Sequence, residues 1–157
     1  MHGTRGRSLP RGGAGDTSPA SHYSSAVNTV AHGIDLVETA RIARMLADHP
    51  ERFTERCFTA RERAYCDRST VRRVEHYAAR FAAKEAVLKA LGTGWSGGIA
   101  WTDIEVTRAE SGAPGIALTG EAARIAGALG IRAWTISISH AGGPTGYAIA
   151  SVIALGA

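Results

Sequence analysis

Two acidic side chains stand in apolar surroundings in this 157-residue sequence. Asp35 interrupts the apolar run 33–37, and Glu85 shares one helical stripe with Phe81 and Leu88. A carboxylate is costly to bury unless it is paired, hydrogen-bonded or bound to a metal. If Asp35 and Glu85 converge, their oxygens would form a Mg²⁺ site of the kind that substrate phosphates complete.

Each carboxylate also has a simpler interpretation. Lys89 follows Glu85 by four residues, the favoured orientation for a helical ion pair worth about 0.2–0.5 kcal/mol. Spacing alone therefore favours a surface salt bridge for Glu85. For Asp35, a structural carboxylate satisfied by a cap or a cation is at least as common as a metal ligand.

His140 ends an alternating strand and precedes a glycine-rich turn, where it could donate to a phosphate or carry a proton. A lone histidine is more often a structural hydrogen-bonding residue. The sequence Gly92-Thr93-Gly94 could approach a ligand closely, although capping of the preceding helix explains it equally well. The phosphate-loop and dinucleotide fingerprints GxxxxGK[ST] and GxGxxG are both missing from the sequence.

Hydrophobic periodicity predicts the elements that must position these residues. Helices are predicted at 38–47, 59–66, 72–91 and 120–129. Strands are predicted at 33–37, 101–108, 115–120, 133–140 and 147–155. Thr59 and Glu62 form a capping-box pattern, and Gly92 is the stop signal of the longest helix. The order of elements indicates a compact α+β domain, with the strand at 33–37 buried.

Composition limits the class of protein. The chain is 45% hydrophobic and 20% charged, which fits one soluble domain. Residues 1–30 are rich in Gly, Ser, Arg and Pro, so we expect a disordered extension followed by one domain over 31–157. No uncharged apolar run of the length of a membrane span and no signal-peptide pattern occurs, so we expect a cytoplasmic protein without a membrane partner. Cys57 and Cys66 have neither metal-site nor disulfide-scaffold spacing, and we expect both to be reduced.

The formal net charge of +4 favours an acidic partner or a phosphorylated ligand. Half of it belongs to residues 1–30, which hold three arginines and the single acidic residue Asp16. The charge alone identifies no partner.

Five segments, taken in order, resemble the holo-acyl-carrier-protein synthase family. They are GIDLVE at 33–38, the segment from Arg52-Phe53 to Phe58-Thr59, RFAAKEAVLKALGTG at 80–94, DIEV at 103–106 and ISISH at 136–140. The resemblance covers residues 32–155. It implies the 4′-phosphopantetheinyl transferase fold, an α+β fold with a ferredoxin-like antiparallel sheet and one long helix.

The resemblance also implies an activity: transfer of 4′-phosphopantetheine from coenzyme A to a serine of apo acyl carrier protein, in fatty acid biosynthesis, with release of adenosine 3′,5′-bisphosphate. By the same match, Asp35 and Glu85 would bind Mg²⁺, and Lys89 would contact the phosphates. Glu85, directly or through metal-bound water, could accept the serine proton. Asp35, Glu85 and Lys89 are therefore the candidate catalytic residues.

Two further residue sets follow from the resemblance. The candidate coenzyme A contacts are Arg80, Phe81, Lys89, Gly92, Thr93, Gly94 and His140. The candidate contacts to the acidic helix of the carrier protein are Arg41, Arg44, Met45, Arg52 and Arg56. The family also implies a homotrimer with its sites between subunits.

Two alternatives stay open at this stage. The same transferase could act on a carrier domain of a polyketide or multidomain synthase, because substrate choice depends on a few surface side chains. The second alternative is a small basic module that binds RNA or an acidic protein and catalyses no reaction. The absence of aromatic platforms among the basic residues argues against RNA, so we expect no nucleic acid partner.

Overall fold

The computed structural model describes residues 28–94, 97–142 and 146–157. Its elements, in chain order, are β1 (Asn28–Glu38), α1 (Thr39–Asp48), α2 (Pro50–Cys57), α3 (Ala60–Cys66), α4 (Arg73–Leu91), the 3₁₀ turn η1 (Trp101–Asp103), β2 (Ile104–Arg108), β3 (Pro114–Leu118), α5 (Gly120–Ala128), β4 (Ala133–Ala141) and β5 (Tyr147–Gly156). Within the described residues, no helix combines the length and the hydropathy needed to cross a membrane.

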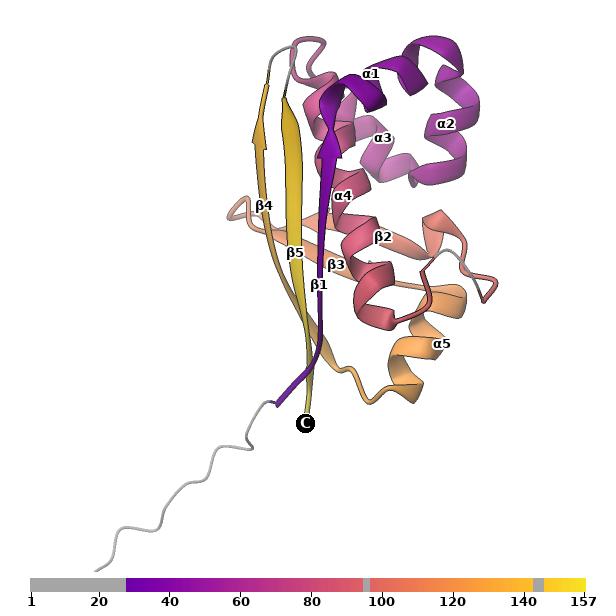
Figure 1. Cartoon of the computed structure of the whole chain (residues 1–157), viewed down its shortest axis with the longest axis vertical. Helices are drawn as coiled ribbons and strands as arrows, with labels where there is room; N and C mark the ends of the chain where they lie inside the picture. Colours follow the sequence, from indigo (N-terminus) through magenta and orange to yellow (C-terminus); the bar gives the residue numbers. More distant parts are fainter. Residues whose placement is uncertain (1–27, 95–96, 143–145) are drawn as a thin grey trace, which may run out of the picture.

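The strands form two antiparallel sheets. The larger sheet has the order β1-β5-β4, with Asp35 opposite Ala150 and His140 opposite Ala148, and the smaller sheet is the β2-β3 hairpin. Figure 1 shows α4 packed on one face of the larger sheet, with α1, α2 and α3 gathered near one end of α4. The long helix thus lies between the sheet and helices α1, α2 and α3, and it contributes more buried core residues than any other element.

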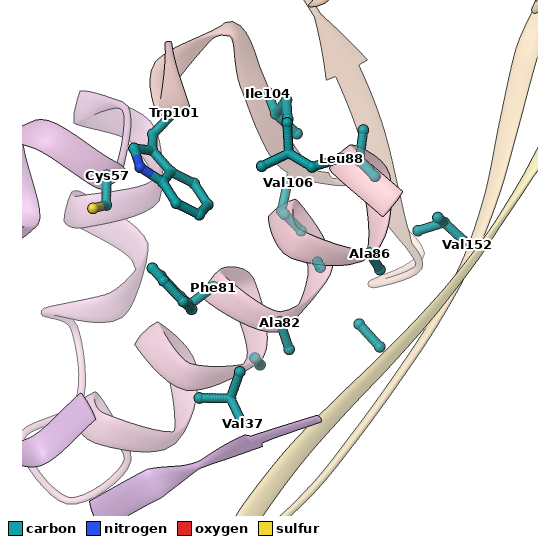
Figure 2. Close-up of a cluster of buried hydrophobic side chains, with 14 of the residues drawn as sticks. Val37, Cys57, Phe81, Ala82, Ala86, Leu88, Trp101, Ile104, Val106 and Val152 are labelled. Atoms are coloured by element: carbon teal, nitrogen blue, oxygen red, sulfur yellow. The ribbon is translucent and has the colours of Figure 1, made fainter. Parts of the chain in front are cut away.

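Small side chains let β1 lie directly on α4. Gly33 faces the helix, and a Cβ at this position would lie 1.9 Å from the carbonyl oxygen of Ala86. Figure 2 shows Val37, Ala82, Ala86 and Val152 filling the space between α4 and the sheet, while Leu88, Ile104 and Val106 pack toward the hairpin. This close approach brings the next inward-facing residue of β1, Asp35, to α4.

The structure confirms the α+β class and most of the predicted elements. The four predicted helices are present within two residues of their predicted bounds. Thr59 and Glu62 form the predicted capping box, with Thr59 N donating to Glu62 Oε2 at 2.9 Å. Gly92 follows the last residue of α4 in the left-handed conformation (φ 72°), as its role as a stop signal requires.

The strands form two sheets, because strands 101–108 and 115–120 pair with each other as the separate β2-β3 hairpin. Three expectations need correction. β1 begins at Asn28, so residues 28–30 of the expected disordered extension belong to the sheet, whereas 1–27 lie outside the described residues. The strand is buried on one face only, because Ile34 and Leu36 alternate with its inward residues and are 48% and 59% exposed. Finally, α2 begins at Pro50, where the sequence analysis places no helix; proline ends a preceding helix, but it also suits the first turn of a new one.

Candidate active site

The predicted carboxylates meet where β1 crosses α4. Asp35 extends from the strand, and Glu85 and Lys89 lie on successive turns of the helix. Lys89 Nζ lies 2.8 Å from Asp35 Oδ1 and 3.0 Å from the carbonyl oxygen of Ile34. The ion pair of Lys89 is therefore with Asp35, and the helical Glu85–Lys89 pair that spacing favoured is not formed.

Glu85 carries a negative charge that no ion pair in the described part of this site neutralises. Within the described residues it forms no ion pair and no hydrogen bond through its side chain. Burial raises its pKa, the negative charge of Asp35 raises it further, and the positive charges of Lys89 and Arg41 oppose that shift. Glu85 lies one helical turn before Lys89, whose ammonium contacts Asp35, so the two carboxylates flank the same lysine.

The donor set is compatible with a hard divalent cation. Asp35 and Glu85 supply oxygen ligands, which Mg²⁺ prefers, and Mg²⁺ usually keeps several waters and one or two protein carboxylates. The described residues contain no cluster of three or more His, Cys, Asp or Glu side chains arranged for a metal. A cation at Asp35 and Glu85 would thus keep several positions for water and substrate oxygens.

A groove beside α1 and α2 gathers all five residues predicted to contact a carrier protein. We call it the arginine groove; its volume is about 490 Å³. Its basic residues are Arg41, Arg44, Arg52 and Arg56, and its apolar residues include Met45, Phe53, Cys57, Phe81 and Trp101. A cationic rim over an apolar floor suits a partner that carries acidic side chains around an apolar one.

Aromatic contacts build the floor of the arginine groove. The rings of Phe81 and Trp101 stack with centroids 4.9 Å apart, and Phe53 lies 6.0 Å from Phe81. Figure 2 shows the Trp101 ring extending toward Phe81, and Cys57 lines the same groove. Phe81, which was grouped with the candidate coenzyme A contacts, thus lies in the groove predicted to receive the carrier protein.

The arginine groove adjoins the carboxylates. The guanidinium of Arg41 lies 5.8 Å from the centroid of the Phe81 ring, and its charge also acts on Glu85. A partner in the groove would therefore lie beside Asp35 and Glu85.

A second basic site surrounds Tyr65. The guanidinium carbons of Arg80, Arg108 and Arg68 lie 4.0, 5.5 and 5.8 Å from the centroid of its ring, and Arg108 also donates to its hydroxyl. Within the described residues, none of these three arginines forms an ion pair with a carboxylate. Stacking on an aromatic ring keeps guanidinium groups close together without neutralising them, which creates a site for an anion.

Histidines complete one side of this site. A cavity of about 360 Å³, which we call the cationic cavity, is lined by Tyr65, Arg72, His76, Arg80, Arg108 and His140 among others. His140 lies at the end of β4 with Nδ1 3.5 Å from Glu75 Oε2. Burial lowers the pKa of His76, and the charge of Arg80 lowers it further, so this imidazole is neutral near pH 7.

The structure thus separates the predicted coenzyme A contacts. Arg80 and His140 meet in the cationic cavity. Gly92, Thr93 and Gly94 lie beyond Lys89 at the end of α4, with positive φ at both glycines. Sequence reasoning missed Tyr65, Arg72, His76 and Arg108 in the cationic cavity and Phe53 and Trp101 in the arginine groove. No local spacing marks these residues, since they converge only when α2, α3, η1 and β2 pack around α4.

Comparisons with known proteins identify the family of the chain. The family model described as "4′-phosphopantetheinyl transferase superfamily" matches residues 31–150. A holo-acyl-carrier-protein synthase of Koribacter versatilis is 47% identical over 121 residues, which cover 77% of this chain and 94% of the relative. One of Anaeromyxobacter dehalogenans is 48% identical over 128 residues, covering 80% and 94%.

Solved structures give the same result. An acyl carrier protein synthase of Plasmodium yoelii with ADP bound superposes with a TM-score of 0.74 at 28% identity, covering 84% of this chain and 98% of that one. The Helicobacter pylori holo-acyl-carrier-protein synthase in complex with coenzyme A has a TM-score of 0.67 at 31% identity, covering 78% and 98%.

Fold and site thus define an α+β transferase with paired carboxylates beside basic binding sites. The chain belongs to the 4′-phosphopantetheinyl transferase superfamily. Within it, the relatives that it matches over nearly their whole length are holo-acyl-carrier-protein synthases.

Proposed function

We propose that this chain transfers 4′-phosphopantetheine from coenzyme A to a serine of apo acyl carrier protein, for fatty acid biosynthesis in the cytoplasm. Adenosine 3′,5′-bisphosphate leaves. The observation that carries the proposal is the position of Asp35, Glu85 and Lys89 next to the arginine groove. The names of the relatives and the coenzyme A bound in the Helicobacter pylori structure support the same donor and acceptor.

The reaction is a displacement at phosphorus. The serine oxygen attacks the β-phosphorus of coenzyme A, and the bond from that phosphorus to the bridging oxygen of the pyrophosphate breaks. Asp35 and Glu85 would hold Mg²⁺, which when bound supplies positive charge against the pyrophosphate oxygens. The chain then needs to hold the reacting groups in line and to move one proton.

Glu85 is the candidate acceptor of the serine proton. Its carboxylate has no ion-pair partner among the described residues, because Lys89 pairs with Asp35, so an oxygen is available to take the proton. Lys89 has 52% of its side chain exposed, so its ammonium can contact phosphate oxygens while Asp35 orients it. Lys89 would neutralise charge on the departing bisphosphate.

The cationic cavity would bind the nucleotide end of coenzyme A. Arg80 and His140 line it, with Arg72 and Arg108 as additional cations. Arginine binds phosphate oxygens through two parallel hydrogen bonds, so this cavity suits a phosphorylated ribose.

A homotrimer would cover the outer sheet face, which we define as the side of the larger sheet turned away from α4. Its exposed apolar residues are Val30, Ile34, Leu36, Tyr147 and Ile149. Apolar side chains gathered on a strand face are typical of an interface between proteins. A second and a third copy of the chain would bury them.

The test is transfer of phosphopantetheine onto an apo carrier protein, followed by mass spectrometry. Incubation with coenzyme A and Mg²⁺ should add one phosphopantetheine to a serine of the carrier. Asp35→Ala and Glu85→Ala should abolish the gain while both proteins stay folded. Absence of transfer by the unmodified enzyme would refute the proposal, as would full activity of both variants. Rates on excised synthase carrier domains would identify the preferred acceptor.

A further inference from the structure

A fully buried ion pair lies behind the arginine groove. Lys84 on α4 and Glu62 on α3 have no exposed side-chain surface, and Lys84 Nζ lies 2.8 Å from Glu62 Oε2. Lys84 Nζ also donates to the carbonyl oxygens of Trp101, at 2.9 Å, and of Ile104. All three donors of the ammonium are therefore used.

Glu62 is equally well satisfied. Its Oε2 accepts the backbone N–H of Thr59, and its Oε1 accepts that of Val106 at 3.0 Å. The Lys84–Glu62 pair thus joins α3, α4, η1 and β2 through side-chain-to-backbone hydrogen bonds. Burial lowers the pKa of Lys84, and the charge of Glu62 opposes that shift, as expected for an ammonium that needs its partner.

Stability alone is a weak explanation for this pair. Two buried charges are often no more stabilising than apolar side chains of similar volume, because their desolvation offsets their attraction. Directional hydrogen bonds do something that apolar packing does less well, since they fix the position of a chosen backbone group. Here the chosen group is the carbonyl of Trp101, a residue of the groove floor.

The connection to the groove is short. Phe81 lies three residues before Lys84 on α4, and its ring stacks on that of Trp101. Lys84 therefore fixes the backbone of Trp101 to the same helix that presents Phe81.

We infer that Lys84 and Glu62 are positioning residues that hold Trp101 on Phe81 and so give the arginine groove its shape for the carrier protein. The inference rests on the proposed carrier-docking role of that groove. Neither side chain reaches a reacting atom, so the pair acts on binding of the acceptor and leaves the chemical step to Asp35, Glu85 and Lys89.

The principal test replaces both charges at once, with Lys84→Met and Glu62→Gln. Glutamine can still accept one of the two N–H groups of Thr59 and Val106 through its single carbonyl oxygen, and methionine fills the space of the lysine stem. We expect the KM for the carrier protein to rise about tenfold, while kcat and the KM for coenzyme A stay within about twofold. Trp101→Ala provides the second arm of a double-mutant cycle.

If the pair acts through Trp101, the charge replacement adds less than twofold to the carrier KM in the Trp101→Ala background. A full tenfold effect in that background would overturn the inference, and so would a fall in kcat at unchanged KM. Fluorescence gives a readout independent of activity: the difference spectrum between each protein and its Trp101→Phe version reports Trp101 alone. An unchanged Trp101 spectrum in the double variant would also overturn the inference.

A milder variant, Lys84→Gln with Glu62 retained, covers the case in which the double variant does not fold. It should change the carrier KM and the Trp101 spectrum in the same direction by a smaller factor. Failure of both variants to fold would assign the pair to global stability and overturn its positioning role. The proposed function fails separately, when the unmodified enzyme transfers nothing to the carrier.

Discussion

Lys89 pairs with Asp35, 54 residues earlier in the chain, and not with Glu85 one helical turn away. This choice leaves Glu85 as a partly buried carboxylate whose pKa is raised by burial and by Asp35. Asp35 has Lys89 as its ion-pair partner, whereas Glu85 has none among the described residues. Such a pair of carboxylates disfavours stability but suits the binding of a cation. We therefore expect Glu85 to lower the stability of the folded protein while it serves the proposed function.

Glu85→Gln should separate activity from stability. The change removes a desolvated charge and its repulsion with Asp35, so the urea midpoint at pH 7.5 should be equal to or higher than that of the parent protein. Transfer activity should fall by about 10²-fold or more, because the proton acceptor and one metal ligand are lost. Urea unfolding and carrier mass spectrometry measure the two effects. A variant that is less stable than the parent protein and yet keeps its transfer activity would contradict this account of Glu85.

Charge reversal in the arginine groove should weaken carrier binding. Arg44→Glu and Arg52→Glu should each raise the KM for the carrier about fivefold or more at low salt, with little change in kcat. The effect should shrink as salt screens the exposed charges. Arg132→Glu, on the exposed start of the β4 segment, is the matched control and should leave the KM unchanged. Equal effects of all three reversals would indicate a non-specific response to net charge.

Gly33→Ala tests the close approach of β1 to α4. The added methyl group would lie 1.9 Å from the Ala86 carbonyl oxygen, so the strand must move and the free energy of unfolding should fall by about 3 kcal/mol or more. Gly127→Ala, in α5 with open space around the new methyl, should leave stability unchanged or raise it by about 0.5 kcal/mol. Urea denaturation compares the two. Similar stability changes for both substitutions would exclude tight packing at Gly33.

Acidic substitutions on the outer sheet face should prevent assembly. Leu36→Glu and Ile149→Glu place charges where the proposed trimer buries apolar side chains, so light scattering should report a mass near that of one chain. Leu129→Glu, at an exposed apolar residue just beyond α5, should keep the parent mass. A trimer that survives both sheet-face substitutions would place the interface elsewhere.

His76 should make stability fall on acidification. Its pKa is lowered in the folded protein by burial and by Arg80, so below the unfolded value of 6.5 the unfolded chain takes up the proton first. The free energy of unfolding should therefore decrease between pH 7 and pH 5, and His76→Gln should make that decrease shallower. Urea unfolding at three pH values measures these slopes.

Features fixed by a few neighbouring residues could be predicted from the sequence. The Thr59 capping box and the Gly92 stop signal involve contacts within four residues, and both are present. Prediction was wrong for α2 because Pro50 has two opposite meanings, and it was incomplete for β1 because the residues before Gly33 carry little apolar character. The partner strand β5 decides where β1 begins.

The site was predictable only where a short motif carried it. Asp35, Glu85 and Lys89 lie in segments that resemble a family, whereas Tyr65, Arg108 and Trp101 converge through the packing of α3, η1 and β2 around α4. Glu62 illustrates the difference. Its capping role follows from spacing, but its pairing with Lys84 depends on two helices meeting in the core.

The pairing of β1 with β5 has a kinetic consequence. Asp35 faces Ala150 across the sheet, so the strand that carries the carboxylate finds its neighbour only after more than a hundred intervening residues are made. Contacts of such large sequence separation slow folding, because loop-closure entropy is lost before the contacts form. A chain emerging from the ribosome can complete α4 early, yet it cannot fix Asp35 in the sheet until the last strand is available. Competence for catalysis should therefore appear late, in one step with closure of the sheet.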